Sequence, residues 1–312
     1  MARAQKEWLT VLFMMTAFGC QSTGSTAGPP AGAPAKPPIA GAPPPPAVPE
    51  AAAEPPAEAA EARSDADAAI DGREVTYSAD GVTMKGYVAS DPSVKGKRPG
   101  ILIVHEWWGH NEYVRRRARM LAKLGYVALA VDMYGDGKQA AHPDDAKKFA
   151  MAVFGNMDGA VKRFEAARKL LGEQQQTDPE KIAAVGYCFG GGIVLTMARR
   201  GVELDGVASF HGSLSTQAPA RKGAIKAKLL ILHGAEDKLV PADQVEAFKS
   251  EMKNAGADMK FVAYPGAKHA FTNPDATAAG EKFKLPVAYN ETADKQSWAE
   301  LEQFLETLYP RE

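Results

Sequence analysis

The sequence predicts an α/β fold, in which a mostly parallel central sheet carries helices on both faces. Short apolar runs alternate with longer segments of helical periodicity from about Glu74 to the C-terminus, and no internal repeat is present. Strands that alternate with helices at this spacing form parallel sheets with crossover helices. The alternating segment has about 240 residues, which suffices for one domain with a substantial core.

The first elements expected are a hairpin and a buried strand. Residues 75–78 and 82–89 have strand-like composition and flank the turn residues Asp80-Gly81. The continuous apolar run 100–104 is typical of a strand that is buried on both faces. A helix is expected over 112–124, before Gly125, followed by a buried strand over 126–131.

The later elements continue this alternation. Helices are expected over 144–154 and 158–171, then a strand over 182–187 and a helix over 193–200. Further strands are expected over 206–210, 229–232 and 259–263, and further helices over 242–254 and about 293–308. We assign this domain to residues 73–312.

The N-terminal segment 1–20 has the pattern of an export signal. Arg3 and Lys6 precede an apolar run over 8–18, which is shorter than the about 20 residues needed to span a bilayer. The run ends in Gly19-Cys20, which resembles the lipobox of bacterial lipoproteins. This resemblance implies a lipidated Cys20 and a membrane-anchored protein on the periplasmic side, with the outer membrane favoured by Gln21. A plain signal peptide with an incidental cysteine is the alternative.

Residues 21–72 are expected to form a disordered linker. The segment is rich in Pro and Ala, contains the run 43–46 of four prolines, and has almost no large apolar residue. Such a composition cannot bury enough apolar surface to offset the entropy lost on ordering. A tether between membrane and domain is the natural use, although a tail without function has the same composition.

Composition argues against several functional classes. Lys+Arg is 37 and Asp+Glu is 38, so the net charge is 37 − 38 = −1, and no nucleic-acid partner is expected. Two cysteines cannot form a disulfide framework, and no CxxC pair suggests zinc. The segment 105–109 is not HExxH, because Gly109 stands at the last position, so no metal is expected. A cluster of basic residues on the helix 112–124 is interpreted as a solvated face; it comprises Arg115, Arg116, Arg117 and Arg119.

The segment 186–190, Gly-Tyr-Cys-Phe-Gly, follows one expected strand and precedes a helix. It matches the G-x-nucleophile-x-G elbow with Cys188 in place of serine. The helix N-terminus behind Cys188 favours a thiolate, and the backbone N–H of Phe189 would stabilise a developing oxyanion. A buried structural cysteine is the alternative interpretation.

Asp237 and His269 are the expected partners of this nucleophile. Asp237 follows the strand 229–232, and His269 follows the strand 259–263, so both lie at carboxyl ends of strands. The order nucleophile, acid, base is that of α/β-hydrolases, which predicts the α/β-hydrolase fold. Asp237 could instead cap the next helix, Glu236 could serve as the acid, and His211 is a weaker candidate for the base.

These motifs together resemble the dienelactone hydrolase family. The resemblance runs from about Val75 to Leu308 and rests on five segments, which are 105–109, 126–132, 186–191, 233–237 and 269–271. It implies a Cys-His-Asp triad without metal or organic cofactor. It also implies that Glu106 contacts the cysteine and takes part in its activation, and that the backbone N–H of Trp107 is the second oxyanion donor.

The sequence departs from the family at one position. Dienelactone-cleaving members have an arginine four residues after the catalytic histidine, where this chain has Asn273. Trp107, Trp108 and Phe271 are expected to form an apolar pocket wall. We therefore expect a hydrolase of small carboxylic esters or lactones that works through an acyl-thioester. The alternatives are a non-catalytic tethered binding protein and a thiol-redox protein, the latter disfavoured because no resolving cysteine is near Cys188.

Overall fold

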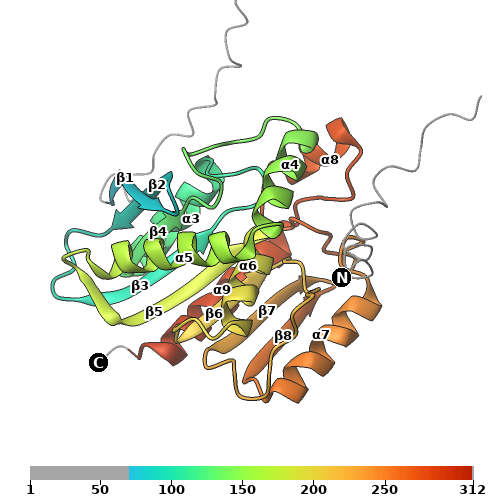
Figure 1. Ribbon diagram of the computed structural model, residues 1–312. Helices are drawn as coiled ribbons and strands as arrows, with labels where there is room; N and C mark the ends of the chain where they lie inside the picture. The colour runs from blue at the N-terminus through green and yellow to red at the C-terminus, as the bar shows by residue number, and fades with distance from the viewer. Residues whose placement is uncertain (1–69, 311–312) are drawn as a thin grey trace, which may run out of the picture. The chain divides into compact units, whose positions relative to one another are not determined.

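The computed structural model describes residues 70–310. The predictions for segment 1–20 and for linker residues 21–69 lie outside the described residues. In the described part an eight-stranded sheet is flanked by helices on both faces (Figure 1). No helix within 70–310 combines the length and the apolar character that crossing a membrane requires.

The sheet has the order β1-β2-β4-β3-β5-β6-β7-β8. The strands are β1 (Asp71–Ala79), β2 (Val82–Ser90), β3 (Arg98–Val104), β4 (Val127–Val131), β5 (Thr177–Tyr187), β6 (Gly206–Phe210), β7 (Lys228–Gly234) and β8 (Met259–Tyr264). β1 pairs antiparallel with β2, and β2 with β4. All other neighbouring strands are parallel, so their carboxyl ends lie along one edge. The mostly parallel sheet confirms the predicted fold class.

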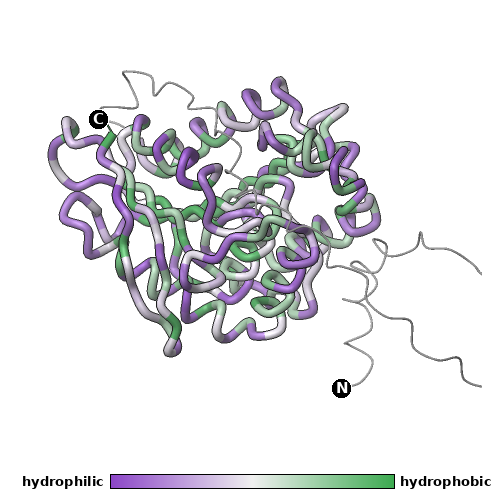
Figure 2. The backbone as a smooth tube through the Cα atoms, turned by 90° about the horizontal axis from the view of Figure 1, so that it is seen from above, coloured by the Kyte–Doolittle hydropathy of each residue, from purple (hydrophilic) through white to green (hydrophobic). Residues whose placement is uncertain are grey.

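Side-chain alternation along the strands divides the core in two. Leu102 packs with helices on one face and Ile103 with helices on the other, because successive strand residues point in opposite directions. The helices are α3 (Glu112–Lys123), α4 (Pro143–Phe154), α5 (Met157–Gly172), α6 (Phe189–Arg199), α7 (Ala242–Ala255), α8 (Ala276–Phe283) and α9 (Glu291–Leu308). α5, α6 and α7 cover one face, and α3 and α9 cover the other. In Figure 2 the segments coloured as hydrophobic accordingly lie mainly in the interior of the fold, and those coloured as hydrophilic lie mainly at its periphery.

The expected strands and helices are present, with differences at some of their ends and one additional helix. β1 begins at Asp71 rather than at residue 75, because Asp71 and Gly72 pair with Ser90 and Ala89 of β2, so these two residues belong to the sheet and not to the linker predicted over 21–72. β5 begins at Thr177, five residues before the apolar run, because Thr177 pairs with Arg98 of β3. α6 begins at Phe189 rather than at residue 193, so three glycines lie inside its first turns. Glycine disfavours helices intrinsically, and here close packing against neighbouring backbone outweighs that preference. The short helix α8 was not predicted.

Candidate active site

Cys188 lies on the sharp turn between β5 and α6, where the motif predicted it. Its backbone has φ 53° and ψ −113°, a strained conformation for a residue with a side chain. The flanking glycines are sterically required. A Cβ on Gly190 would lie 2.2 Å from the carbonyl oxygen of Val104, and a Cβ on Gly186 would lie 2.2 Å from the carbonyl oxygen of Gly190. The turn therefore presents the sulfur at the carboxyl edge of the sheet.

Three side chains predicted from distant segments meet at this edge. The Nε2 atom of His269 lies 3.1 Å from the Sγ atom of Cys188. Its Nδ1 atom lies 2.8 Å from a carboxylate oxygen of Asp237. The other oxygen of Asp237 accepts from the backbone N–H of Leu239, and α7 begins after Pro241, so Asp237 does not cap that helix. The neighbouring Glu236 is exposed.

Asp237 and His269 each stabilise the charged form of the other. Burial alone would lower the pKa of His269, but the Asp237 carboxylate and the Cys188 sulfur raise it well above its ordinary value. Burial would raise the pKa of Asp237, whereas His269 and the Leu239 N–H hold it below its usual range. The environment therefore favours an imidazolium that donates to both the carboxylate and the sulfur.

Glu106 follows β3 and lies buried beside this cluster. Its Oε2 accepts a 2.6 Å hydrogen bond from the side-chain amide of Asn273, and its Oε1 has no partner in the described part of the chain. Burial raises the pKa of Glu106 to about 7, although Asn273, His269 and Arg117 partly oppose this. No hydrogen bond among residues 70–310 joins Glu106 to Cys188; its polar contact is with Asn273.

Two backbone amides are available as oxyanion donors. The N–H of Phe189 is at the first position of α6, where a helix has no internal acceptor for it. The N–H of Trp107 makes no hydrogen bond in the described residues. The N–H of Gly190 donates to the carbonyl oxygen of His105 at 3.1 Å, which holds the loop after β3 against the start of α6. Both predicted donors thus belong to segments that pack together beside Cys188.

The predicted aromatic wall is only partly at the site. Trp107 and Trp108 are half-buried with ring centroids 5.1 Å apart, and Trp108 lies 6.1 Å from Phe283 of α8. Phe271 is fully buried and belongs to the core beneath α3 and α9, where its ring lies 5.2 Å from that of His211. This position corrects the prediction that Phe271 lines the substrate pocket, since a fully buried ring contributes to packing instead.

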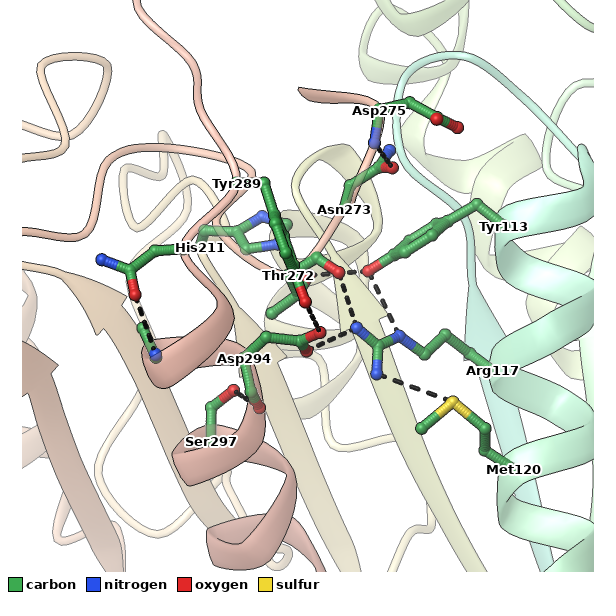
Figure 3. Close-up of polar contacts among 12 residues, drawn as sticks. Tyr113, Arg117, Met120, His211, Thr272, Asn273, Asp275, Tyr289, Asp294 and Ser297 are labelled. Atoms are coloured by element: carbon green, nitrogen blue, oxygen red, sulfur yellow. Dashed lines mark hydrogen bonds and ion pairs between the residues drawn. The ribbon is translucent and has the colours of Figure 1, made fainter. Parts of the chain in front are cut away.

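A second correction concerns Arg117. The charge pattern predicts that it lies on a solvated basic face, but it is 2% exposed and binds Thr272 and Asp294 (Figure 3). The helical spacing offered a signal for this burial, because residue 117 lies four positions after Tyr113 and four before Leu121, on the buried stripe of α3.

His211 is the competing candidate for the catalytic base. Its Nδ1 instead accepts from the backbone N–H of Cys188 at 3.2 Å, and its Nε2 faces Thr272.

No group of three or more metal-ligating side chains occurs within residues 70–310.

Comparisons with known proteins show which family the chain belongs to. The model of the "Dienelactone hydrolase family" matches residues 84–309, well over half of the chain. A protein of Aquifex aeolicus named "Putative carboxymethylenebutenolidase" is 31% identical over 234 residues, which cover 71% of this chain and 98% of that protein. A solved structure titled "m3DLH" is 33% identical with a TM-score of 0.73, covering 77% of this chain and 99% of that one.

A second solved structure is a dienelactone hydrolase-like promiscuous phosphotriesterase from metagenomic libraries. It is 32% identical, with a TM-score of 0.72, and the match covers 77% of this chain and 99% of that one. Sequence and fold thus lead to the same family. The chain belongs to the dienelactone hydrolase family and is a hydrolase of the α/β type that acts on esters or lactones.

Proposed function

We propose that this hydrolase cleaves carboxylic esters or lactones through a covalent acyl-thioester on Cys188. The observation that carries the proposal is the pair of contacts made by one imidazole. His269 Nε2 lies 3.1 Å from Cys188 Sγ, while its Nδ1 lies 2.8 Å from Asp237. A nucleophile, a base within hydrogen-bond reach and a carboxylate that orients the base are the elements of nucleophilic acyl transfer.

The reaction proceeds in two halves. The sulfur of Cys188 attacks the carbonyl carbon, and its proton resides on His269. The N–H groups of Phe189 and Trp107 donate to the resulting oxyanion. The alcohol leaves with a proton from His269, which yields the thioester. Water, deprotonated by His269, then attacks the thioester and releases the carboxylic acid together with free Cys188.

The surroundings of Glu106 favour uncharged substrates. Among residues 70–310 the Glu106 carboxyl group has one hydrogen-bond partner, the neutral amide of Asn273, and position 273 does not carry an arginine. With a pKa of about 7, the Glu106 carboxyl group is partly ionised at neutral pH and repels a substrate carboxylate increasingly as the pH rises above 7. The half-buried Trp108 offers an apolar contact for the acyl or leaving group. We therefore propose neutral acyl or aryl esters and lactones as substrates.

The test compares wild type with Cys188→Ala on a panel of p-nitrophenyl esters, small lactones and the dienelactone itself. A phosphotriester belongs in the panel because of the activity named for the metagenomic relative. We expect turnover of neutral esters by wild type only, and a mass increase equal to the acyl group on the peptide with Cys188. Equal rates in both proteins would refute the mechanism. No turnover of any ester, together with an unreactive Cys188, would favour the tethered binding protein instead.

A further inference from the structure

A buried polar network connects α3 to the loop that carries His269. It consists of Arg117, Tyr113, Thr272, Asp294 and His211 and is drawn in Figure 3. Arg117 Nη2 donates to the carbonyl oxygen of Thr272 at 2.7 Å and to Asp294 at 2.6 Å. Its Nε lies 3.4 Å from the hydroxyl of Tyr113. A guanidinium that is 2% exposed therefore bridges two helices and one loop.

The network ends at the nucleophile. Thr272 Oγ1 lies 2.6 Å from the hydroxyl of Tyr113 and 2.7 Å from Nε2 of His211. The other ring nitrogen of His211 accepts at 3.2 Å from the backbone N–H of Cys188, which it shares with the carbonyl oxygen of Phe210 at 3.0 Å. Since Nδ1 accepts, Nε2 carries the proton and donates to Thr272. The hydroxyl of Thr272 thus connects Arg117 and Tyr113, through His211, to the strained turn that holds Cys188.

The same network fixes the loop that carries the base. Thr272 lies three residues after His269 and directly before Asn273, the partner of Glu106. Between His269 and Thr272, the backbone of Ala270 has φ 59°, a conformation that residues with side chains rarely adopt. The carbonyl oxygen of Phe271 accepts from the backbone N–H of Asn290, which caps α9, the helix that bears Asp294. A strained loop keeps its conformation only when its surroundings hold it there.

We propose that Arg117 is a positioning residue for catalysis. By fixing Thr272 it sets the place of His269 relative to Cys188, and through His211 it supports the turn of the nucleophile. The inference rests on the proposed function. A misplaced base lowers the rate of the chemical step more than it weakens substrate binding, so loss of the guanidinium should lower kcat and leave KM nearly constant.

The alternative is a purely structural role, and the chain offers a matched control. Arg199 is also buried; it binds the carboxylate of Glu251 and the carbonyl oxygen of Leu214 at the far end of α6. Arg117→Lys and Arg199→Lys each replace a planar, multidentate donor by a point charge in a similar setting. Both should lower the thermal midpoint. Only Arg117→Lys should lower kcat, on the order of tenfold or more, well below that midpoint.

Variants of Thr272 test the connection itself. Thr272→Val removes the hydroxyl that faces Tyr113 and His211 and keeps the shape of the side chain, whereas Thr272→Ser keeps the hydroxyl. The valine variant should show the kcat loss, and the serine variant should recover most of the wild-type value.

A readout without ester separates this inference from the proposed function. The pH profile of iodoacetamide alkylation at Cys188, followed by peptide mass spectrometry, depends on the neighbouring imidazole. We expect Arg117→Lys to shift this profile and Arg199→Lys to leave it in place. Unchanged kcat and alkylation profile in Arg117→Lys would overturn the positioning role even if wild type hydrolyses esters. A shifted profile in a protein that turns over no ester would support the role and reject the proposed function.

Discussion

The side-chain amide of Asn273 donates to the buried carboxyl group of Glu106 at 2.6 Å. The amide is neutral, so it only partly opposes the burial that raises the pKa of Glu106 to about 7. A carboxyl group that retains part of its protons at neutral pH changes both the stability of the protein and the charge near His269.

Glu106→Gln tests the effect on stability. Above its usual pKa of 4.5 the carboxyl group loses its proton in the unfolded chain, while the folded protein retains it up to about pH 7. The folded state therefore binds more protons in this interval, and the free energy of unfolding falls as pH rises, by about 3 kcal/mol at most. The variant lacks this decline, so its stability relative to wild type should increase between pH 5 and pH 8.

The measurement is urea unfolding of wild type and Glu106→Gln at both pH values. Glu306→Gln is the control, because it removes the same charge from an exposed position. If the difference between wild type and Glu106→Gln is the same at pH 5 and pH 8, the pKa of Glu106 is not raised.

Asp237→Asn tests the assignment of the acid. The carboxylate of Asp237 accepts from His269 at 2.8 Å, and an amide there can hold the ring in the wrong tautomer. We expect kcat to fall on the order of 10³- to 10⁴-fold. Glu236→Gln is the matched control, because the adjacent Glu236 is exposed and was the competing candidate. Steady-state kinetics that show the larger loss in Glu236→Gln would reverse the assignment.

The sequence predicted the parts of the molecule that depend on local patterns. The apolar runs predicted the strands β3 and β4, and the glycines around Cys188 predicted the sharp turn between β5 and α6. Backbone conformation and burial at these places follow from a few adjacent residues. The chain order added Asp237 and His269, whose placement at the carboxyl ends of parallel strands brings them to one edge.

The remaining features depend on contacts between distant segments. Arg117 belongs to a cluster of charges in the sequence, but its partners Thr272 and Asp294 lie 155 and 177 residues further along the chain. Phe271 follows the catalytic loop in sequence and yet points into the core, since Ala270 turns the backbone with a positive φ. The helical spacing places Arg117 on the buried stripe of α3, but no residue near either position specifies these distant partners.

The N-terminal segment leads to a prediction about location. We propose that Cys20 is lipidated and that the linker tethers the hydrolase on the periplasmic side of a membrane, with the outer membrane favoured by Gln21. Wild type should fractionate with membranes and incorporate radiolabelled palmitate, whereas Cys20→Ser should do neither. Esterase activity in washed membranes should follow the same pattern. Wild type in the soluble periplasmic fraction, without label, would instead indicate a plain signal peptide.

Gly190→Ala tests the close packing of the nucleophile turn. An added Cβ would lie 2.2 Å from the carbonyl oxygen of Val104 and 2.7 Å from that of His105, and neither backbone atom can move without displacing β3 or its following loop. We expect a loss of stability on the order of 3 kcal/mol or more, with loss of activity, because overpacking forces backbone shifts. Gly192→Ala is the matched control in the same helix. Its Cβ would meet the nearest atom, Cβ of Ser213, at an ordinary 3.4 Å, and alanine favours the helix by about 1 kcal/mol over glycine. Thermal unfolding should therefore place Gly192→Ala at or above wild type and Gly190→Ala well below it; equal midpoints would mean that the turn has room for a side chain.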